Sequence, residues 1–426
     1  IYINHFKWYF VLKIDRKMKQ FEIPIFYKSS LITRLKEYRN LIDPRKQDLS
    51  PTELDFGPVR FYLVRHFGFC YGVQNAIEIS YKILEENPDK RIFLLSEIIH
   101  NPIVNEDLQF RGINFIMKPG GEQIIPWEEI TPDDIVIIPA FGTTLEIEEK
   151  LKSLGLQIEK YDTTCPFVEK VWNRAATLAK KNYTVIIHGK YKHEETRATF
   201  SHSVRHTNAV IVLNLEEAKI LGKIILGELP PEKFYEFFKG KYSEGFDPEI
   251  HLKRIGVVNQ TTMLASETAE ISEYFKNVMI QKYGIENLKE HYADTSDTLC
   301  YATYENQEAT IEMLNKKADF AIVVGGYNSS NTSHIVELCE TKVKTYFVSS
   351  QEKILSPNEI LHFDLKTRQE KLTRNYLPSK SKIDILLTSG ASCPDAVIEG
   401  VLRKIHLFFP NAKSIEDVTE SILNSR

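Results

Sequence analysis

The cysteines of this chain are its first candidates for chemistry, and one of them stands in a distinctive context. Cys165 is followed directly by Pro166, and the apolar residues after it recur at spacings of three and four. Proline fits the first position of a helix, and such spacing places apolar side chains on one helix face, so we expect Cys165 to cap a helix. The positive end of a helix dipole favours a thiolate over a thiol. The alternative is a structural cysteine, since free cysteine is among the most often buried residues.

Two further cysteines resemble Cys165 in position. Cys70 and Cys300 each come just before a helical pattern. Three thiolates from distant segments can hold zinc or an iron–sulfur cluster, and three ligands leave one metal position open, as a catalytic site requires. Their wide separations in the sequence match no short metal motif, so spacing alone does not show whether the three cysteines bind a metal. We expect Cys339 to lie on the apolar side of a helix, whereas Cys393, which also precedes a proline, is a rival ligand.

Polar clusters supply further candidate groups. Hydroxyls and backbone N–H groups at helix starts suit a phosphate or diphosphate. Glu195 suits proton delivery, provided that burial raises its pKa toward neutral. Each residue taken alone also fits an ordinary cap, turn or first-turn charge. The candidates are His100, Asn101, His193, Glu194, Glu195, Thr261, Thr262, Ser329, Ser330, Asn331 and Ser392.

The elements that must position these groups follow a regular pattern. From Val59 onward, short runs rich in Ile, Val and Phe alternate with amphipathic stretches, which predicts βαβ units and a parallel sheet. Many runs end in one of the polar clusters, and ligands of open α/β sheets bind at the carboxyl ends of the strands. The predicted strands are Phe61–Val64, Ile92–Leu95, Ile135–Ile138, Val185–Ile187, Val210–Leu213, Ile255–Val258, Phe320–Val324, Tyr346–Val348 and Ile383–Leu387.

Length and recurrence indicate several domains. A chain of 426 residues suggests two or three, and a strand, a loop cysteine and a helix recur in three segments. We expect an extension outside the main fold at 1–58 and α/β domains at 59–165, 166–297 and 298–426. Prolines and glycines at 229–254 indicate a surface insertion in the middle domain.

Composition excludes some classes of protein. The net charge of −4 argues against a general nucleic-acid or membrane-surface binder. Apolar runs are far shorter than a membrane helix needs. The five cysteines are widely spread, so we expect them to be reduced and the protein to be cytoplasmic. The sequence starts at Ile1, which makes Met18 the expected native start; a basic organelle transit segment is the alternative.

An ordered set of motifs resembles the 4-hydroxy-3-methylbut-2-enyl diphosphate reductase family, also called IspH or LytB. The resemblance runs from about Val59 to about Phe409. The motifs are Gly68-Phe-Cys-x-Gly-Val73, Ile99-His-Asn101, Asp162-x-Thr-Cys-Pro-x-Val-x-Lys-Val171, His193-x-Glu195, Asn259-Gln-Thr-Thr262, Leu299-Cys-Tyr-Ala-Thr303, Asn328-Ser-Ser-Asn331 and Gly390-Ala-Ser-x-Pro-Asp395.

This resemblance implies a fold, a cofactor and a reaction. The fold is a trefoil of three α/β domains with mostly parallel sheets around a central [4Fe–4S] cluster, one per subunit. Its three ligands are Cys70, Cys165 and Cys300, so Cys393 is not expected to bind iron. The reaction is the last step of the non-mevalonate isoprenoid pathway, in which two electrons and two protons remove the substrate hydroxyl as water. The products are isopentenyl and dimethylallyl diphosphates.

The resemblance also assigns residues and partners. Glu195 is implied as the proton source, with Thr261 near the substrate hydroxyl. A ferredoxin- or flavodoxin-type protein is the implied electron donor. Phe141 stands where many family members have histidine, although the plant and cyanobacterial branch also carries phenylalanine. The implied diphosphate contacts are His100, His193, Ser329, Ser330, Asn331 and Ser392.

Two other functions use parts of the same residue set. A hydrolase or transferase with Cys165 as nucleophile and His193 as base requires neither iron nor three cysteines. An iron–sulfur electron carrier or sensor requires the cysteines but neither Glu195 nor the Ser–Asn cluster. Of the three functions, only the reductase needs the cluster, the proton donor and the anion site together.

Overall fold

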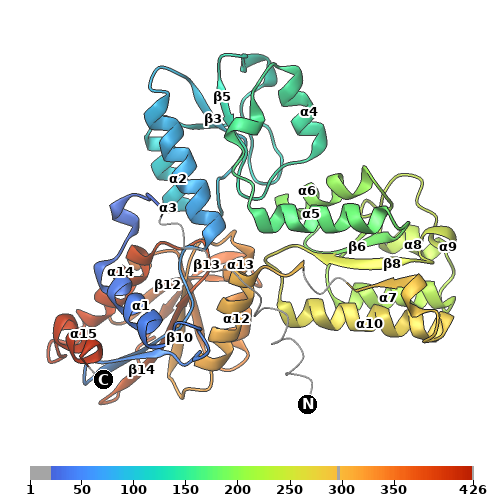
Figure 1. Ribbon diagram of the computed structural model, residues 1–426. Coiled ribbons are helices and arrows are strands. Elements are labelled where there is room, and N and C mark those ends of the chain that lie inside the picture. The colour runs from blue at the N-terminus through green and yellow to red at the C-terminus, as the bar shows by residue number, and fades with distance from the viewer. Residues whose placement is uncertain (1–20, 295–297, 425–426) are drawn as a thin grey trace.

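The computed structural model describes residues 21–294 and 298–424, which form three α/β lobes (Figure 1). Each lobe is built on its own sheet, and most neighbouring strands are parallel. The predicted fold class is therefore confirmed. Met18 lies outside the described residues.

The first lobe contains a small parallel sheet in the order β4-β3-β5. Helix α2 starts at its junction with the other lobes, and α3 and α4 complete it (Figure 1). The bounds are α2 Tyr71–Glu86, β3 Ile92–Leu94, α3 Pro102–Phe110, β4 Asn114–Phe115, β5 Ile135–Ile137 and α4 Leu145–Ser153.

The second lobe contains a parallel sheet in the order β7-β6-β8-β9. Every residue of β6, β7 and β8 is buried, as expected for strands covered by helices on both faces. The bounds are α5 Pro166–Ala179, β6 Thr184–His188, α6 Glu194–Val204, β7 Ala209–Val212, α7 Leu215–Leu226, α8 Glu232–Phe237, α9 Pro248–His251, β8 Ile255–Asn259, α10 Ala265–Tyr283, α11 Leu288–His291 and β9 Tyr292–Ala293.

The third lobe has a seven-stranded sheet in the order β1-β2-β14-β10-β11-β12-β13. Its centre is parallel, and antiparallel strands close both edges. The bounds are α1 Ser30–Ile42, β1 Thr52–Asp55, β2 Val59–Leu63, α12 Tyr301–Met313, β10 Phe320–Val324, α13 Ser330–Glu340, β11 Thr345–Val348, β12 Glu359–Asp364, β13 Gln369–Arg374, β14 Ile383–Ser389, α14 Asp395–His406 and α15 Ile415–Leu423.

From helix α1 onward, the described part of residues 1–58 belongs to the third lobe, whereas Tyr27, before α1, is buried in the core of the first lobe. Both placements correct our expectation of an extension outside the main fold. Helix α1 buries Leu31, Ile32 and Leu35 in the core, and Lys36 Nζ lies 2.7 Å from Asp395 Oδ1 at the start of α14. Strand β1 pairs with β2. Prolines around α1 concealed one short amphipathic helix, whose apolar stripe needs a partner surface to be stable.

Two further placements differ from the linear division of the chain. Strand β2, which we assigned to the first domain, pairs with β14 in the third lobe. Residues 229–254 are not a surface insertion throughout, because Phe234, Phe238 and Phe246 are buried in the core of the second lobe. Aromatic side chains bury large apolar areas, which explains why this segment packs despite its prolines and glycines. The division at residues 165 and 297 stays a prediction.

The structure confirms each predicted strand run as a strand, with shifts of one or two residues at the ends. The runs were recognisable because buried parallel strands are almost continuously apolar. The exposed edge strand β13, Gln369–Arg374, was missed because its residues are almost all polar. No helix within the described ranges is long and apolar enough to cross a membrane.

Residue Ile32 provides a test of whether the N-terminal segment is part of the fold. Its side chain is completely buried, so Ile32→Ala leaves a cavity and lowers the free energy of unfolding by about 2–5 kcal/mol. Leu41 lies on the same helix but is 79% exposed, so Leu41→Ala is the control and has little effect. Urea unfolding of both variants measures the difference. Equal midpoints for the two variants contradict the packing of α1.

Candidate active site

The three lobes meet around one cavity of about 90 Å³. Its walls come from the starts of α2, α5 and α12 and from loops at the carboxyl ends of β3, β5, β6, β8, β10 and β14. Every residue to which the resemblance assigns a catalytic, substrate-binding or metal-ligating role lines this cavity, whereas the candidates Asn101 and Glu194 and the rival ligand Cys393 do not. The residues with an assigned role are Cys70, His100, Cys165, His193, Glu195, Thr261, Cys300, Ser329, Ser330, Asn331 and Ser392.

The three cysteines occupy equivalent positions. Cys70, Cys165 and Cys300 are the N-cap residues of α2, α5 and α12, which confirms the predicted cap at Cys165. Gly72, in the first turn of α2, allows Cys165 to approach, because a Cβ atom at this position would lie 2.5 Å from Cys165 Sγ. Three helix starts from separate segments therefore present their thiols to the same space.

Burial dominates the acidity of these thiols. It raises the pKa of Cys70, Cys165 and Cys300, the last to about 12, and the neighbouring Cys70 sulfur raises the pKa of the other two further. Backbone N–H groups at each helix start act in the opposite direction but do not outweigh desolvation. The helix start thus favours the thiolate of Cys165, as expected, but burial outweighs this effect. A bound cation is what would deprotonate such thiols.

The remaining cysteines lie away from the cavity. Cys393 and Cys339 are completely buried in the core of the third lobe, as expected for Cys339. The Sγ atom of Cys393 contacts the carbonyl oxygen of Pro394 at 3.7 Å. Within the described parts of the chain, no three His, Cys, Asp or Glu side chains are grouped tightly enough for a single metal ion.

Glu195 lies in the first turn of α6 with only 1% of its surface exposed. Burial raises its pKa to about 7, although hydrogen bonds from Thr261 and the nearby His100 oppose the shift. The backbone N–H of Thr261 donates to Glu195 Oε1 and fixes the carboxyl group against the β8 loop. Glu195 is therefore partly protonated at neutral pH and can release its proton there.

His193 presents a donor to the cavity. Its Nδ1 atom accepts a hydrogen bond from the backbone N–H of Glu195, so the ring proton of the neutral imidazole is on Nε2. Burial lowers the pKa of His193 well below its ordinary value, with His100, Lys190 and His334 adding to the shift. The Nε2 atom is buried and has no partner among the described residues. It is available to an anionic ligand.

Phe141 stacks on His100, with ring centroids 4.3 Å apart and an angle of 19° between the planes. Its ring also packs edge-on against His193 at 5.7 Å. His100 Nδ1 lies 3.1 Å from Glu97 Oε2. The phenylalanine therefore holds two imidazoles in place without contributing a hydrogen-bond donor of its own.

The start of α13 forms the anion-binding side of the cavity. Ser329 caps the helix through its hydroxyl, which accepts from the N–H of Thr332. The Ser392 hydroxyl donates to Ser329 Oγ at 3.2 Å, and Asn331 Oδ1 accepts from the N–H of Ala391 at 2.8 Å. A helix N-terminus surrounded by hydroxyl and amide donors is suited to phosphate groups.

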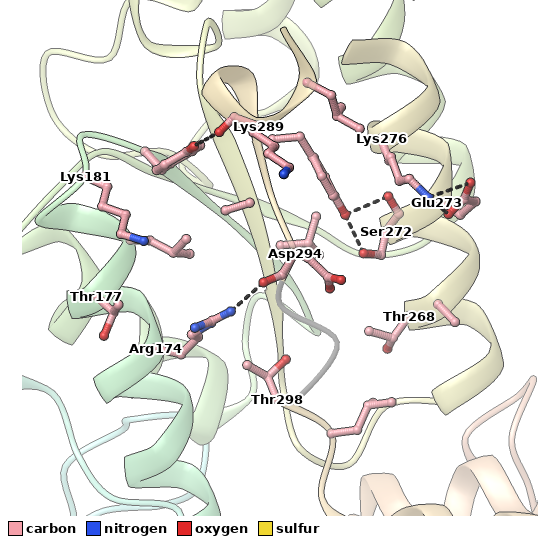
Figure 2. Close-up of a pocket in the computed structure, with 18 residues that line it drawn as sticks. Arg174, Thr177, Lys181, Thr268, Ser272, Glu273, Lys276, Lys289, Asp294 and Thr298 are labelled. Atoms are coloured by element: carbon pink, nitrogen blue, oxygen red, sulfur yellow. Dashed lines mark hydrogen bonds and ion pairs between the residues drawn. The ribbon is translucent and has the colours of Figure 1, made fainter. Parts of the chain in front are cut away.

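A second cavity, of about 1110 Å³, lies between α5 and α10 beside β9 (Figure 2). Its polar lining is already engaged: Lys276 pairs with Glu273 at 3.0 Å, and the hydroxyls of Ser272 and Tyr292 are 2.6 Å apart. None of the cysteines, nor Glu195, lines it. Although this second cavity is larger, it is not the better candidate for an active site, because the three cysteines and Glu195 line the smaller cavity.

Two site features were not anticipated. The sequence analysis treated Phe141 only as a missing histidine, whereas the structure shows its ring contacts. Lys190, which donates to Ser330 Oγ at 3.3 Å, was not considered as a site residue. Its position directly after Gly189 at the end of β6, among other polar donors, was the available signal.

Comparison with known proteins agrees with this geometry. A family described as "LytB protein" matches residues 61–406, the span that contains every residue of the cavity. The chain belongs to the LytB family. It is 42% identical to the 4-hydroxy-3-methylbut-2-enyl diphosphate reductase of Gloeothece citriformis and 40% identical to that of Picosynechococcus, in each case over 89% of both chains.

The fold of this LytB-family chain also matches a solved structure. The E-1-hydroxy-2-methyl-but-2-enyl-4-diphosphate reductase from Plasmodium falciparum superimposes with a TM-score of 0.56 at 23% identity. The match covers 84% of this chain and 95% of that one. At this level of identity, the match supports the fold.

The protonation of Glu195 can be tested directly. Infrared spectra of the LytB-family protein should contain a protonated-carboxyl band that is present at pH 6, declines through about pH 7 and is absent from Glu195→Gln. Glu267→Gln is the control, because His188 lowers the pKa of Glu267 and keeps it ionised throughout this range. Persistence of the band in Glu195→Gln assigns the proton to another group.

Proposed function

We propose that this chain is an iron–sulfur reductase that converts 4-hydroxy-3-methylbut-2-enyl diphosphate to isopentenyl and dimethylallyl diphosphates. The observation that carries the proposal is the shared cavity, where three thiols, one protonatable carboxyl group and an anion-binding helix start face one another. The family match and the names of the relatives support the same reaction. The reaction consumes two electrons and two protons and releases the substrate hydroxyl as water.

The three cavity cysteines are the proposed ligands of a [4Fe–4S] cluster. Thiolates are the usual ligands of iron–sulfur clusters, and no fourth cysteine of the described residues lines the cavity. When bound, such a cluster supplies the electrons and an iron that lacks a cysteine ligand and can act as a Lewis acid.

The polar residues of the cavity bind and orient the substrate. His193 Nε2–H, the hydroxyls of Ser329, Ser330 and Ser392 and the start of α13 together offer donors to a diphosphate. With the diphosphate fixed on the α13 side, the hydroxyl end of a five-carbon chain points across the cavity toward the cysteines. Such positioning holds the reacting groups in one geometry, so that they need not meet by diffusion in solution.

Glu195 is the proposed proton source, and Thr261 positions it. A carboxyl group whose pKa is about 7 is half protonated at neutral pH, which suits general acid catalysis. The Thr261 N–H holds Oε1 of the carboxyl group and so fixes its orientation in the cavity. Burial excludes bulk water from this transfer.

The alternative functions explain fewer of the observations. A cysteine nucleophile needs a lowered pKa, whereas burial raises the pKa of Cys165, and His193 uses Nδ1 to accept from Glu195 N–H. An electron carrier has no use for a buried, protonatable Glu195 or for the donors of α13. A ferredoxin- or flavodoxin-type electron donor and a cytoplasmic location remain part of the proposal.

The choice of iron ligands can be tested by anaerobic reconstitution. Wild-type protein should bind iron and sulfide and show a broad visible band, whereas Cys165→Ser should lose most of the iron. Cys393→Ser is the matched control and should retain the wild-type content, because Cys393 lies in the core of the third lobe. A colourless, iron-free wild-type protein would falsify the proposed cofactor.

The role of Glu195 can be tested by kinetics. Glu195→Gln should retain iron content and substrate affinity but lose at least about 100-fold in kcat, a typical contribution of a general acid. In the wild type, kcat should fall as the pH rises through about 7, because the ionised carboxylate cannot donate a proton. Full turnover by Glu195→Gln, or an unchanged pH profile, removes Glu195 from this role.

A further inference from the structure

One cation reaches the anion-binding side of the cavity from the opposite lobe. Lys190 follows β6 in the second lobe, and its ammonium group donates to Ser330 Oγ at 3.3 Å, at the start of α13 in the third lobe. None of the residues that line the cavity is a lysine or an arginine. The lysine therefore supplies a full positive charge next to donors that are otherwise neutral.

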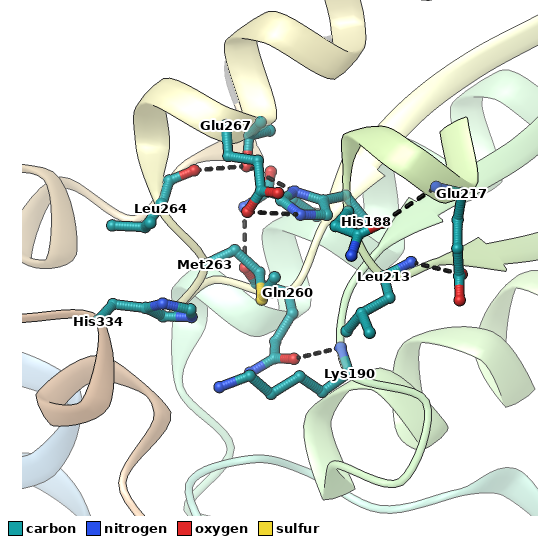
Figure 3. A network of polar contacts seen from close by, with 12 residues as sticks. His188, Lys190, Leu213, Glu217, Gln260, Met263, Leu264, Glu267 and His334 are labelled. Atoms are coloured by element: carbon teal, nitrogen blue, oxygen red, sulfur yellow. Dashed lines mark hydrogen bonds and ion pairs between the residues drawn. The ribbon is translucent and has the colours of Figure 1, made fainter. Parts of the chain in front are cut away.

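The backbone of Lys190 is fixed on its own lobe. Its N–H donates to Gln260 Oε1 at 3.0 Å (Figure 3). The same oxygen accepts from the Thr196 hydroxyl at 2.9 Å. Gly189, immediately before it, leaves no room for a side chain, because a Cβ atom would lie 2.6 Å from Thr196 Oγ1. With its main chain held in this way, Lys190 can cross to α13 only through its side chain.

The surroundings of Lys190 are mixed in charge. Burial lowers its pKa, Glu337 and Glu267 oppose that shift, and Arg368 adds to it. His334 follows Ser330 by one turn of α13 and is engaged through Nδ1 by Glu337 Oε2 at 2.6 Å. The buried Nε2 atom of His334 has no partner among the described residues. Glu337 is thus the carboxylate that competes most directly with a bound anion for the charge of Lys190.

We propose that Lys190 is a positioning residue for the substrate diphosphate, which it recognises through Ser330 and by its charge. Because the ammonium group donates to Ser330 Oγ, the Ser330 hydroxyl keeps its own proton for a phosphate oxygen. A charged donor also makes that hydroxyl a stronger donor. This inference rests on the proposed function, since it assumes a diphosphate ligand.

Lys190 contributes a hydrogen-bond donor and a positive charge, neither of which Phe141 can supply. Phe141 stacks on His100 and offers no hydrogen-bond donor, so the first-lobe side of the site adds little charge. Lys190 adds a cation from the second lobe to the hydroxyls of the third lobe. A diphosphate bound by the third-lobe hydroxyls would therefore lie near a cation that the second lobe supplies through Ser330.

The test compares Lys190→Met with Lys192→Met in the iron-loaded protein. Lys192 is an exposed lysine two residues further along the same loop, so its removal changes the net charge equally. Calorimetric titration with inorganic diphosphate should show affinity lowered by about tenfold or more in Lys190→Met, as expected for the loss of a charge-assisted contact. The loss should shrink at high salt. Lys192→Met should bind like the wild type.

Kinetics and two more variants separate positioning from structural support. Lys190→Met should raise KM while kcat changes by less than about threefold, and Lys190→Arg should recover part of the affinity. Glu337→Gln should not weaken diphosphate binding, whereas a lysine that only neutralises Glu337 predicts similar losses in both variants. Equal affinities of Lys190→Met and Lys192→Met overturn the inference. If the wild type neither binds diphosphate nor turns over substrate, the proposed function itself is wrong.

Discussion

The desolvation of three thiols at one point is the constraint on which the rest of the structure depends. Cys70, Cys165 and Cys300 each begin a helix in a different segment of the chain, and burial raises the pKa of all three. Protonated thiols crowded at helix starts contribute little to stability by themselves. The arrangement is explained by a group that binds thiolates and offsets the cost of burying them.

The lobes divide the chemical work around that point. The second lobe holds Glu195 in a dry environment where it retains a proton near neutral pH, and the third lobe presents the Ser329 cap and its hydroxyl neighbours. The first and third lobes also approach closely: at Gly326, any side chain would collide with the backbone of His100. Acid and anion site are therefore positioned by packing between lobes.

Single strands and helix starts could be predicted from the sequence because the patterns that mark them have a local physical cause. A buried parallel strand must be apolar along its length, so β6, β8 and β10 were evident from composition. Proline after Cys165 marked a helix start for the same kind of reason. The role of α1 could not be predicted from the sequence. Its short apolar stripe is buried only when it packs against α14 and the sheet of the third lobe.

By itself, the sequence determined the α/β class, the positions of nine strands and, through its ordered motifs, many of the polar residues and the cysteines that line the cavity. Only the tertiary structure decided how those residues behave. The acidity of Glu195 and the cysteines depends on burial, which separate segments create together. Likewise, the stacking of Phe141 and the reach of Lys190 to Ser330 join residues that are distant in sequence. Local patterns encode elements, whereas pKa values and contacts depend on neighbours that only folding brings together.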